Sequence, residues 1–344
     1  MPSSAILVPL YIYPLLGAWN PLYEVIEANP TTQFQVVINP HNGPGATPLP
    51  DSNYCREIPK LRSHPNVVVY GYVNVVWATR DLDEVCKDVE IYAAWPQHWH
   101  HHHHDQMNLQ TQHDTKQAPQ HQDQNVSVPI GIDGVFVDET PIDAGDHEKK
   151  FLGTLKTLVE SHFGAKKKAA APGQKYPLII HNPGCMPPPA IRELADLTVV
   201  FEDTYAVFLQ RLAQGVLALP NGTVASAGND EAEDECNDTD TDAAKQERLR
   251  RAVVIHSVPL PDIDAATNLT AAQHPLVPGS NATIASQEVR AELVRDLVRN
   301  ATEVAGTVFI TELSSGFYET FSRGWREWAG VIGSGTVADD DADE

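Results

Sequence analysis

The stretch that decides the fold runs from Ile132 to Thr140 and reads Ile-Asp-Gly-Val-Phe-Val-Asp-Glu-Thr. Its apolar centre is short and made of β-branched and aromatic residues, which predicts a buried strand. Two adjacent carboxylates, Asp138 and Glu139, follow at once. Because a buried strand cannot hold two charges in its middle, both are expected at its carboxyl end. In parallel α/β folds ligands bind at that end, and the alternative is that one of the two only caps the next helix.

Strand-like and helix-like patterns alternate on both sides of this stretch. The predicted strands are Ala5–Tyr13, Phe34–Ile38, Asn66–Val73, Ile132–Val137, Pro177–Ile180, Leu197–Phe201, Val253–Val258 and Thr307–Thr311. The predicted helical segments are Pro21–Ala28, Tyr54–Arg62, a helix capped by Thr79 and ending at Tyr92, His147–Phe163, Ala190–Ala195, Tyr205–Leu219, Val289–Asn300 capped by Ser286, and Phe317–Val331. This alternation predicts a single (β/α)8 TIM barrel. A doubly wound open sheet fits less well, because no Gly-rich phosphate loop follows any strand.

Two segments interrupt the alternation. Residues 97–125 are rich in His and Gln, including the run His100–His104, and residues 229–242 are strongly acidic. Both lack apolar periodicity, so we expect disordered low-complexity insertions in a catalytic domain that spans 1–337, followed by an acidic tail at 338–344. Adjacent His side chains do not share one coordination geometry, and no metal site is predicted there.

Composition excludes several classes of function. The chain has 344 residues, of which 42% are hydrophobic, and its formal net charge is −22. This charge argues against nucleic-acid and anionic-membrane partners and is compatible with a neutral or cationic ligand. No apolar run of about 18 residues predicts a transmembrane helix. No motif indicates a cofactor.

Other features bear on the compartment. The segment Ala5–Leu16 is apolar, but no Lys or Arg precedes it, so we interpret it as the first strand rather than a signal peptide. Several Asn-x-Ser/Thr sequons nevertheless favour an extracellular or cell-surface location, at Asn125, Asn221, Asn237, Asn268, Asn281 and Asn300. The cysteines form no CxxC pair, and each is interpreted as a buried small hydrophobe or loop thiol: Cys55, Cys86, Cys185 and Cys236.

Carboxylates and polar side chains follow strand after strand at the end of the barrel that we call the mouth. A mouth lined with acids, without a metal motif, is typical of a glycoside hydrolase, which needs one carboxylic acid and one carboxylate. Asp138, Glu139 and Glu202 are the candidate catalytic residues. Their strands are next-nearest neighbours, roughly 10 Å apart. Side chains reaching inward would bring the carboxyl groups to about 5–9 Å, which fits both retaining and inverting hydrolysis.

Further residues are candidates for binding the substrate. These are Tyr11, Asn39, His41, Tyr72, His181, Asn182, His256 and Glu312. Aromatic residues near the mouth would stack on sugar rings, with a place in the core as the alternative for each: Tyr11, Tyr13, Trp19, Tyr70, Tyr72, Trp77 and Trp95.

Several stretches, in order, resemble the spherulin 4 family, which is assigned as glycoside hydrolase family 135. They are Val8-Pro-Leu-Tyr-Ile-Tyr-Pro14 with Trp19, Val37-Ile-Asn-Pro40 with Gly43-Pro-Gly45, Gly71-Tyr-Val73 with Arg80, Gly134–Glu139, Asn182-Pro-Gly184 and Val199–Tyr205. The resemblance implies a (β/α)8 barrel that hydrolyses α-1,4-linked galactosamine-containing polysaccharide such as galactosaminogalactan. It also implies that the catalytic acids are Asp138, Glu139 and Glu202.

The chain departs from this family in some places. Residues Asn74–Ala78 differ where the family usually has a Thr and a Gly, and the two insertions are not family features. The leading hypothesis is an endo-acting glycosidase with a polysaccharide substrate. The competing hypothesis is a cell-surface or spore-coat structural protein that binds glycan without cleaving it, because fold alone does not fix function.

Overall fold

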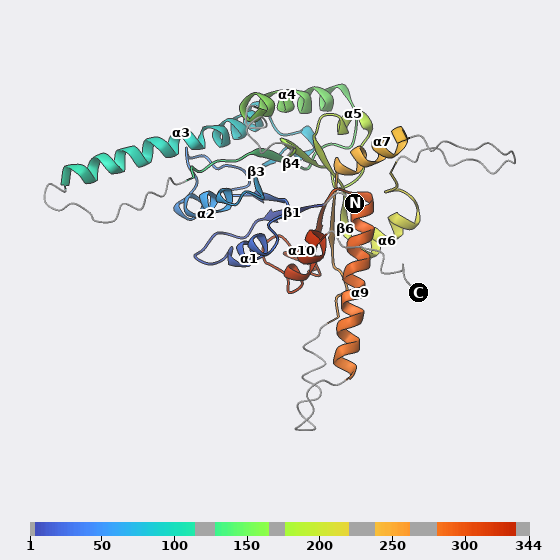
Figure 1. Cartoon of the computed structure of the whole chain (residues 1–344). Helices are drawn as coiled ribbons and strands as arrows, with labels where there is room; N and C mark the ends of the chain where they lie inside the picture. Colours follow the sequence, from blue (N-terminus) through green and yellow to red (C-terminus); the bar gives the residue numbers. More distant parts are fainter. Residues whose placement is uncertain (1–3, 114–127, 165–175, 220–237, 262–280, 335–344) are drawn as a thin grey trace, which may run out of the picture. The chain divides into compact units, whose positions relative to one another are not determined.

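The described strands form a closed, parallel barrel in chain order (Figure 1). The computed structural model describes residues 4–113, 128–164, 176–219, 238–261 and 281–334, without the side chains of 102–113, 238–241 and 281–286. The strands are β1 (Ala5–Leu10), β2 (Phe34–Ile38), β3 (Val67–Asn74), β4 (Gly134–Asp138), β5 (Ile179–Asn182), β6 (Leu197–Thr204), β7 (Arg251–His256) and β8 (Thr307–Ile310). The predicted (β/α)8 barrel is confirmed.

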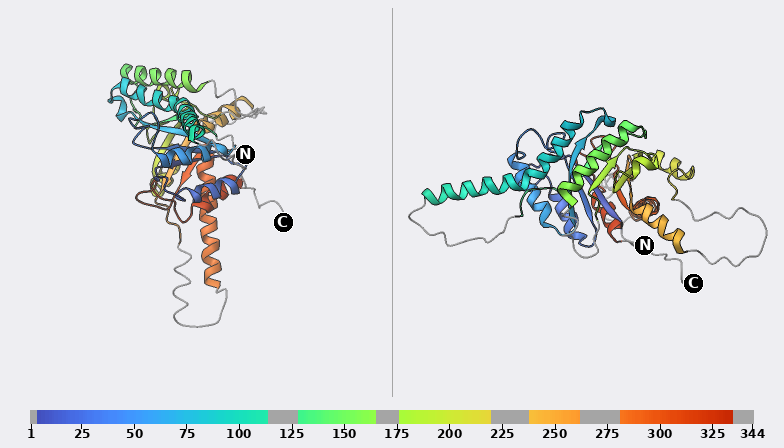
Figure 2. Two further views of the ribbon diagram at one scale, coloured as in Figure 1. Left: turned by 90° about the vertical axis from the view of Figure 1, so that its left-hand side faces the viewer. Right: turned by 90° about the horizontal axis from the view of Figure 1, so that it is seen from above.

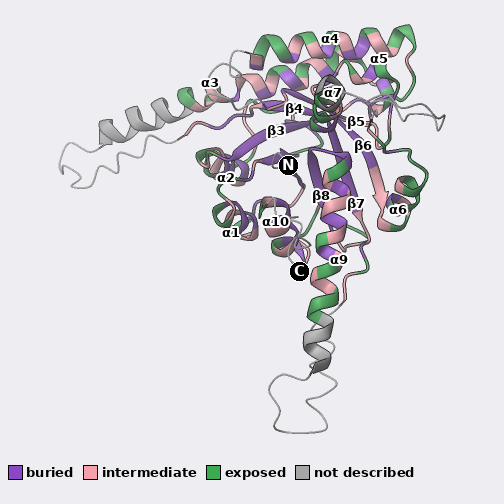
Figure 3. Cartoon of the chain, turned by 45° about the vertical axis from the view of Figure 1, so that its right-hand side comes forward, coloured by how far each residue is buried: buried purple, intermediate pink, exposed green. Residues whose placement is uncertain are grey.

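Helices connect the strands, as the alternating pattern predicts. They are α1 (Asn20–Ala28), α2 (Ser52–Ser63), α3 (Leu82–His113), α4 (Asp146–Phe163), α5 (Pro189–Arg192), α6 (Tyr205–Ala213), α7 (Asp238–Leu249), α9 (Asn281–Val304) and α10 (Trp325–Ser334), with a short helical turn η1 (Val76–Ala78) after β3. In Figure 3 the strands are buried and α4 exposes one face. The buried face of α4 carries Phe151, Leu152, Leu155, Val159 and Phe163, which repeat at helical spacing.

The chain divides into two compact units by its internal contacts. The N-terminal unit is Leu7–Thr198, and the C-terminal unit joins Met1–Ile6 to Val199–Glu344. Within the C-terminal unit, Thr307 of β8 pairs with Ala252 of β7 and with Ala5 of β1. Arg251, which is buried, donates to the carbonyl of Leu217 at 3.0 Å, so the buried guanidinium is satisfied at the start of β7.

In the N-terminal unit the two faces of β3 have different partners. An added Cβ at Gly71 would lie 2.7 Å from the ring of Tyr92 in α3, so this face packs directly against the helix and requires glycine. Tyr72 points to the other side, where its ring stacks on Phe136 of β4 with centroids 6.4 Å apart. Since Tyr72 pairs with Phe136 and Phe136 with Ile180, these three residues share the interior face of the barrel.

Some predicted boundaries are wrong. β1 ends at Leu10 rather than Tyr13, and β6 continues to Thr204, so Glu202 lies inside the strand instead of after it. Further corrections concern helix ends. Asp81, not Thr79, accepts hydrogen bonds at the start of α3; Ser286 lies inside α9; and the last helix begins at Trp325 rather than Phe317. These errors fall at the ends of strands and helices, where no long apolar periodicity marks the boundary.

The prediction that the His/Gln-rich segment is disordered is wrong for its first part. Helix α3 continues into it as far as His113, and this end of α3 extends away from the strands of its own unit (Figure 1 and the right-hand view of Figure 2). Residues 114–125 lie outside the described residues. The acidic segment is also corrected at its end, because α7 begins at Asp238, while 229–237 are not described.

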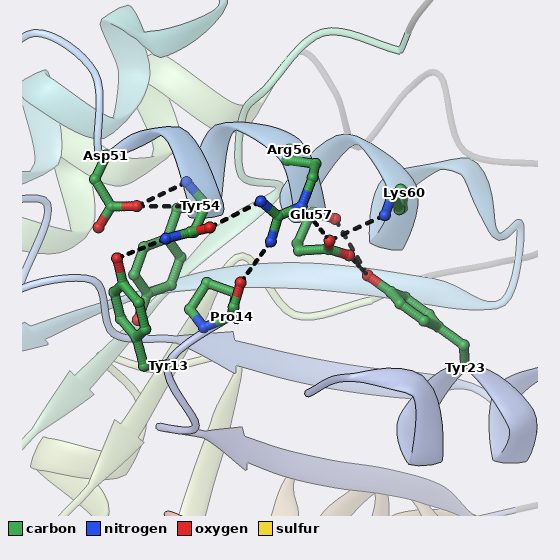
Figure 4. Close-up of polar contacts among 9 residues, drawn as sticks. Tyr13, Pro14, Tyr23, Asp51, Tyr54, Arg56, Glu57 and Lys60 are labelled. Carbon is green, nitrogen blue, oxygen red and sulfur yellow. Dashed lines mark hydrogen bonds and ion pairs between the residues drawn. The ribbon is translucent and has the colours of Figure 1, made fainter. Parts of the chain in front are cut away.

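A polar network ties the loop after β1 to helix α2 (Figure 4). The carboxylate of Glu57, whose side chain is 4% exposed, accepts hydrogen bonds from Arg56 at 2.7 Å, Lys60 at 2.9 Å and Tyr23 at 2.8 Å. The guanidinium of Arg56 also donates to the carbonyl of Pro14 at 2.7 Å. The network therefore fixes the loop that follows Tyr11.

We predict that Glu57→Gln lowers the free energy of unfolding by about 2 kcal/mol at pH 7, the usual contribution of hydrogen bonds to a charged group. Burial alone would raise the pKa of Glu57, but the hydrogen bonds from Arg56, Lys60 and Tyr23 lower it. A depressed pKa stabilises the protein above the unfolded value of about 4.3 and the stabilisation is lost as the pH falls. Urea unfolding from pH 7 to pH 3 should show the gap between the two proteins narrowing.

The matched control for this prediction is Glu27→Gln, because Glu27 is exposed on α1. We expect it to change the unfolding free energy by less than about 0.5 kcal/mol. Equal effects of the two substitutions would show that the Glu57 network does not stabilise the fold.

Candidate active site

Three parallel strands bring polar side chains into register at the mouth. Asn74 at the end of β3 pairs with Asp138 at the end of β4, and Asp138 pairs with Asn182 at the end of β5. All three are half-buried. Each lies two residues beyond the interior set Tyr72, Phe136 and Ile180, and strand side chains alternate. The polar row therefore faces the same interior as that set.

Both oxygens of the Asp138 carboxylate have donors. The phenol of Tyr72 donates to Oδ2 at 2.8 Å, and the side-chain amide of Asn182 donates to Oδ1 at 2.9 Å. Burial, and then the adjacent charge and hydrogen bond of Asp138, raise the pKa of Tyr72 far above its usual value. Tyr72 therefore stays protonated and keeps donating, which holds Asp138 in one orientation.

The two donors are themselves held in place. The amide oxygen of Asn182 accepts from the backbone N–H of Gly184 at 3.0 Å, and the ring of Tyr11 contacts Tyr72 edge-on at 5.6 Å. Tyr92 donates to the carbonyl of Tyr72 at 3.0 Å. Asn182, Tyr72 and Tyr11 are thus brought together with Asp138.

Glu139 occupies a different position from the one that strand alternation implies. Strand β4 ends at Asp138, and Glu139 has a positive φ of 52°. Its carbonyl accepts from the N–H of Trp77 at 2.7 Å, while the next residue, Thr140, donates to the carbonyl of Asn182 at 3.1 Å. Strand alternation therefore does not set the direction of the Glu139 side chain, because Glu139 lies beyond the strand.

The turn after β3 is strained. Val76, Trp77 and Ala78 have φ values of 45°, 52° and 63°, and none is glycine. L-residues in left-handed backbone cost about 1–2 kcal/mol each, so the three together cost about 3–6 kcal/mol. This is a substantial part of the usual total stability of a protein, about 5–15 kcal/mol. No glycine of this chain marks the turn, although it falls in the stretch Asn74–Ala78 that departs from the resembled family.

The C-terminal unit holds a second cluster, around Glu202. Phe201 packs edge-on against Phe208 of α6 at 5.3 Å, so Glu202 points to the other side of β6. The phenol of Tyr318 donates to Oε1 of Glu202 at 2.5 Å. Sequence reasoning missed Tyr318, because it placed this residue in an amphipathic helix. Phe317, whose ring centroid lies 4.5 Å from that of Tyr318, was missed for the same reason.

His256 belongs to this second cluster. Its ring stacks on Phe317 with centroids 4.5 Å apart and planes 9° from parallel. Its Nδ1 lies 2.9 Å from the hydroxyl of Ser257, which has a positive φ of 57°. The end of β7 and the segment after β8 thereby meet beside Tyr318, which donates a hydrogen bond to Glu202.

His181 is not at the mouth, which corrects its predicted role. It is 1% exposed, and neither ring nitrogen has a hydrogen-bond partner among the described residues. Burial, followed by the positive charge of Lys156, lowers its pKa to about 3. His181 precedes Asn182 in the same strand, so alternation turns it away from the interior. It is a neutral residue of the layer between sheet and helices.

Two further candidates, Asn39 and His41, lie in the loop after β2. The side-chain oxygen of Asn39 accepts from the N–H of Gly43 at 3.0 Å, which shapes the loop that contains it. His41 is exposed, and its backbone N–H donates to the carbonyl of Gly43 at 3.1 Å. Asn39 therefore has a structural role in the turn, and the side chain of His41 faces solvent.

Glu312 anchors the segment before α10. Its carboxylate accepts from the N–H of Gly324 at 2.9 Å and from the indole of Trp328 at 3.4 Å. Burial alone would raise the pKa of Glu312, but these bonds and one from Ser322 lower it. The carboxylate predicted to bind substrate is thus engaged in holding Gly324 and Trp328.

We predict that Glu312→Gln lowers the unfolding free energy by about 1–2 kcal/mol at pH 7, because a charge-assisted acceptor is lost. The depressed pKa means that this contribution is present above about pH 4.3 and disappears as the pH falls below it. Thermal unfolding at pH 7 and pH 3 measures the effect. The exposed Glu319→Gln, in the same segment, is the control and should leave stability unchanged; an equal loss there would contradict the role of Glu312.

Among the described residues, no three His, Cys, Asp or Glu side chains come together as a group that would hold a metal ion. Cys55 and Cys86 are free thiols, and Cys236 lies outside the described residues. No helix among the described residues is both long and apolar enough to cross a membrane.

The fold and the site define a (β/α)8-barrel protein with acids at the carboxyl ends of its strands. Residues 5–332 match the family described as Spherulation-specific family 4, Spherulin4, and the chain belongs to this family. The predicted resemblance is confirmed. No curated protein matches the chain.

Solved structures give a similar result. The chain is similar to Sph3 from Aspergillus clavatus, whose crystal structure is in complex with GalNAc, at 32% identity and a TM-score of 0.65, over 96% of this chain and 98% of that one. A chitinase from Rhizomucor miehei aligns over 96% and 98% of the two chains at 11% identity and a TM-score of 0.37. That second likeness is too distant to carry an argument.

Proposed function

We propose that the protein is a glycoside hydrolase that cleaves within α-1,4-linked galactosamine-containing polysaccharide, such as galactosaminogalactan. The observation that carries the proposal is the orientation of Asp138 by Tyr72 and Asn182 at the mouth of the barrel. Two donors hold the carboxylate in one orientation, which fits a group that must be positioned against the scissile bond. The likeness to Sph3, which is solved with GalNAc, supports a hexosamine as the sugar.

Glu202 is the proposed partner of the Asp138–Glu139 pair. The general architecture of (β/α)8 folds, in which the carboxyl ends of the strands surround one mouth, supports this proposal. The hydrogen bond from Tyr318 fixes the orientation of Glu202 in its own unit. We assign Glu202 as proton donor to the leaving oxygen. One of Asp138 and Glu139 attacks the sugar or activates water, and the other orients the substrate nitrogen or a hydroxyl.

We predict that Asp138→Asn, Glu139→Gln and Glu202→Gln each lose at least ~10²-fold in turnover, the usual contribution of a positioned acid or base. Each change is nearly isosteric, so circular dichroism and thermal unfolding should match the parent protein. The assay is the release of oligosaccharides from galactosaminogalactan. Asp203→Asn is the control, because Asp203 adjoins Glu202 but accepts from the backbone of Thr204.

Two results would contradict this assignment. Full activity of a folded Glu202→Gln protein would remove β6 from the catalytic machinery. Binding without any cleavage, on both acetylated and partly deacetylated polymer, would instead support the competing function of a non-catalytic glycan-binding protein.

We also predict a preference for neutral or cationic glycan. The net charge of −22 attracts a partly deacetylated, positively charged polymer and repels uronic-acid polymers. Binding to the cationic polymer should weaken as sodium chloride is raised from 20 to ~500 mM, because surface attraction is screened. Polygalacturonate is the matched anionic polymer, and equal binding to it at low salt would show that charge does not select the substrate. The sequons fit an extracellular place for this activity.

A further inference from the structure

The turn Val76–Ala78 places an aromatic side chain at an unusual cost to the fold. The left-handed backbone of this turn is a conformation that glycine adopts freely and that β-branched and aromatic residues avoid. A backbone outlier of this kind persists only where its surroundings over-determine it, and such outliers gather at functional sites. A function for the residues of this turn would account for the strain.

Hydrogen bonds from several elements hold the turn. The N–H of Val76 donates to the side chain of Asn74 at 2.8 Å, and the N–H of Trp77 donates to the carbonyl of Glu139 at 2.7 Å. His147 of α4 contacts the carbonyl of Ala78 through Nε2 at 2.9 Å. Arg80 reaches the carbonyl of Asn74 at 3.1 Å. The turn is thus fixed by β3, the end of β4 and α4 together.

The turn presents the indole of Trp77 to solvent. Trp77 is 56% exposed, whereas Trp99 is half-buried and the other four tryptophans are at most 5% exposed: Trp19, Trp95, Trp325 and Trp328. Leaving a large aromatic ring in water forgoes the stabilisation that its burial would bring. Folding therefore explains neither the strain of the backbone nor the exposure of the ring.

The backbone that carries the exposed ring is bonded to the Asp138–Glu139 pair. The backbone of Trp77 bonds directly to Glu139, and Val75, two residues earlier, donates to the carbonyl of Asp138 at 3.1 Å. The turn and the acidic pair are therefore one hydrogen-bonded unit within the N-terminal unit. Trp77 is therefore anchored to the acidic pair through its backbone, while its side chain is exposed to solvent.

We propose that Trp77 is the aromatic platform of a sugar-binding subsite beside Asp138 and Glu139, and that it packs against one hexosamine ring of the glycan. The galacto configuration gathers several C–H groups on one face of the ring, which suits an indole, and a deacetylated ring adds an ammonium group that the indole also attracts. This inference rests on the proposed function for the identity of the sugar.

The substitution Trp77→Gly separates binding from folding. Glycine removes the ring and adopts the positive φ without strain, so the melting temperature should stay the same or rise. Affinity for galactosamine-containing oligosaccharides, measured by isothermal titration calorimetry, should fall at least tenfold, which is about 1.4 kcal/mol. Trp77→Phe should bind within about threefold of the parent protein, since it keeps an aromatic face. In the cleavage assay, KM should rise with little change in kcat, as for a group that binds ground and transition states alike.

The control is Leu249→Ala, which trims an exposed apolar side chain just before β7 and should leave affinity unchanged. Unchanged affinity of Trp77→Gly, in a protein that binds and cleaves the glycan, would overturn the subsite and leave the proposed function standing. A drop in melting temperature together with affinity, not restored by Trp77→Phe, would also overturn it, because Trp77 would then be structural. Loss of affinity without any cleavage by the parent protein would support the subsite and reject the hydrolase. Absence of glycan binding by the parent protein would reject both.

Discussion

The register of β3, β4 and β5 is the constraint on which the N-terminal half of the site depends. Asn74, Asp138 and Asn182 are paired residues on adjacent strands, so their side chains emerge from the same face at the same height. A slip of one residue in any strand would turn its polar side chain toward the helices. The barrel prevents such a slip through close packing behind the sheet, where the ring of Tyr92 leaves no room for a side chain at Gly71. Packing on the outer face of β3, at Gly71, thereby helps to fix the register that orients Asp138 of β4 on the inner face.

The sequence predicts the parts of the molecule that local pattern determines. Phe34–Ile38 forms β2 with the bounds that its apolar run indicates. Asp138 lies at the end of β4 because an apolar run cannot contain a charge. The alternation of eight such runs with helical segments predicts the barrel, and the motifs predict the family. These features depend on near neighbours in the chain or on the requirement to bury apolar surface.

The features that the sequence did not predict depend on contacts between residues far apart in the chain, or on which of two adjacent strand residues faces inward. Tyr318 meets Glu202 across 116 residues, and nothing local to either indicates the pair. His181 was expected beside Asn182 at the mouth, but adjacent strand residues face opposite sides, and only the strand boundary decides which one faces inward. The extension of α3 over polar residues was missed because helix growth from an anchored first half needs no new nucleus and no apolar stripe.

The genetic code gives the strained turn a further meaning. Codons for valine, tryptophan and alanine each become a glycine codon through one base change, so the backbone strain of Val76, Trp77 and Ala78 is removable at any of the three positions by a single mutation. The present sequence has glycine at none of the three positions, so the chain carries backbone strain that one base change would relieve.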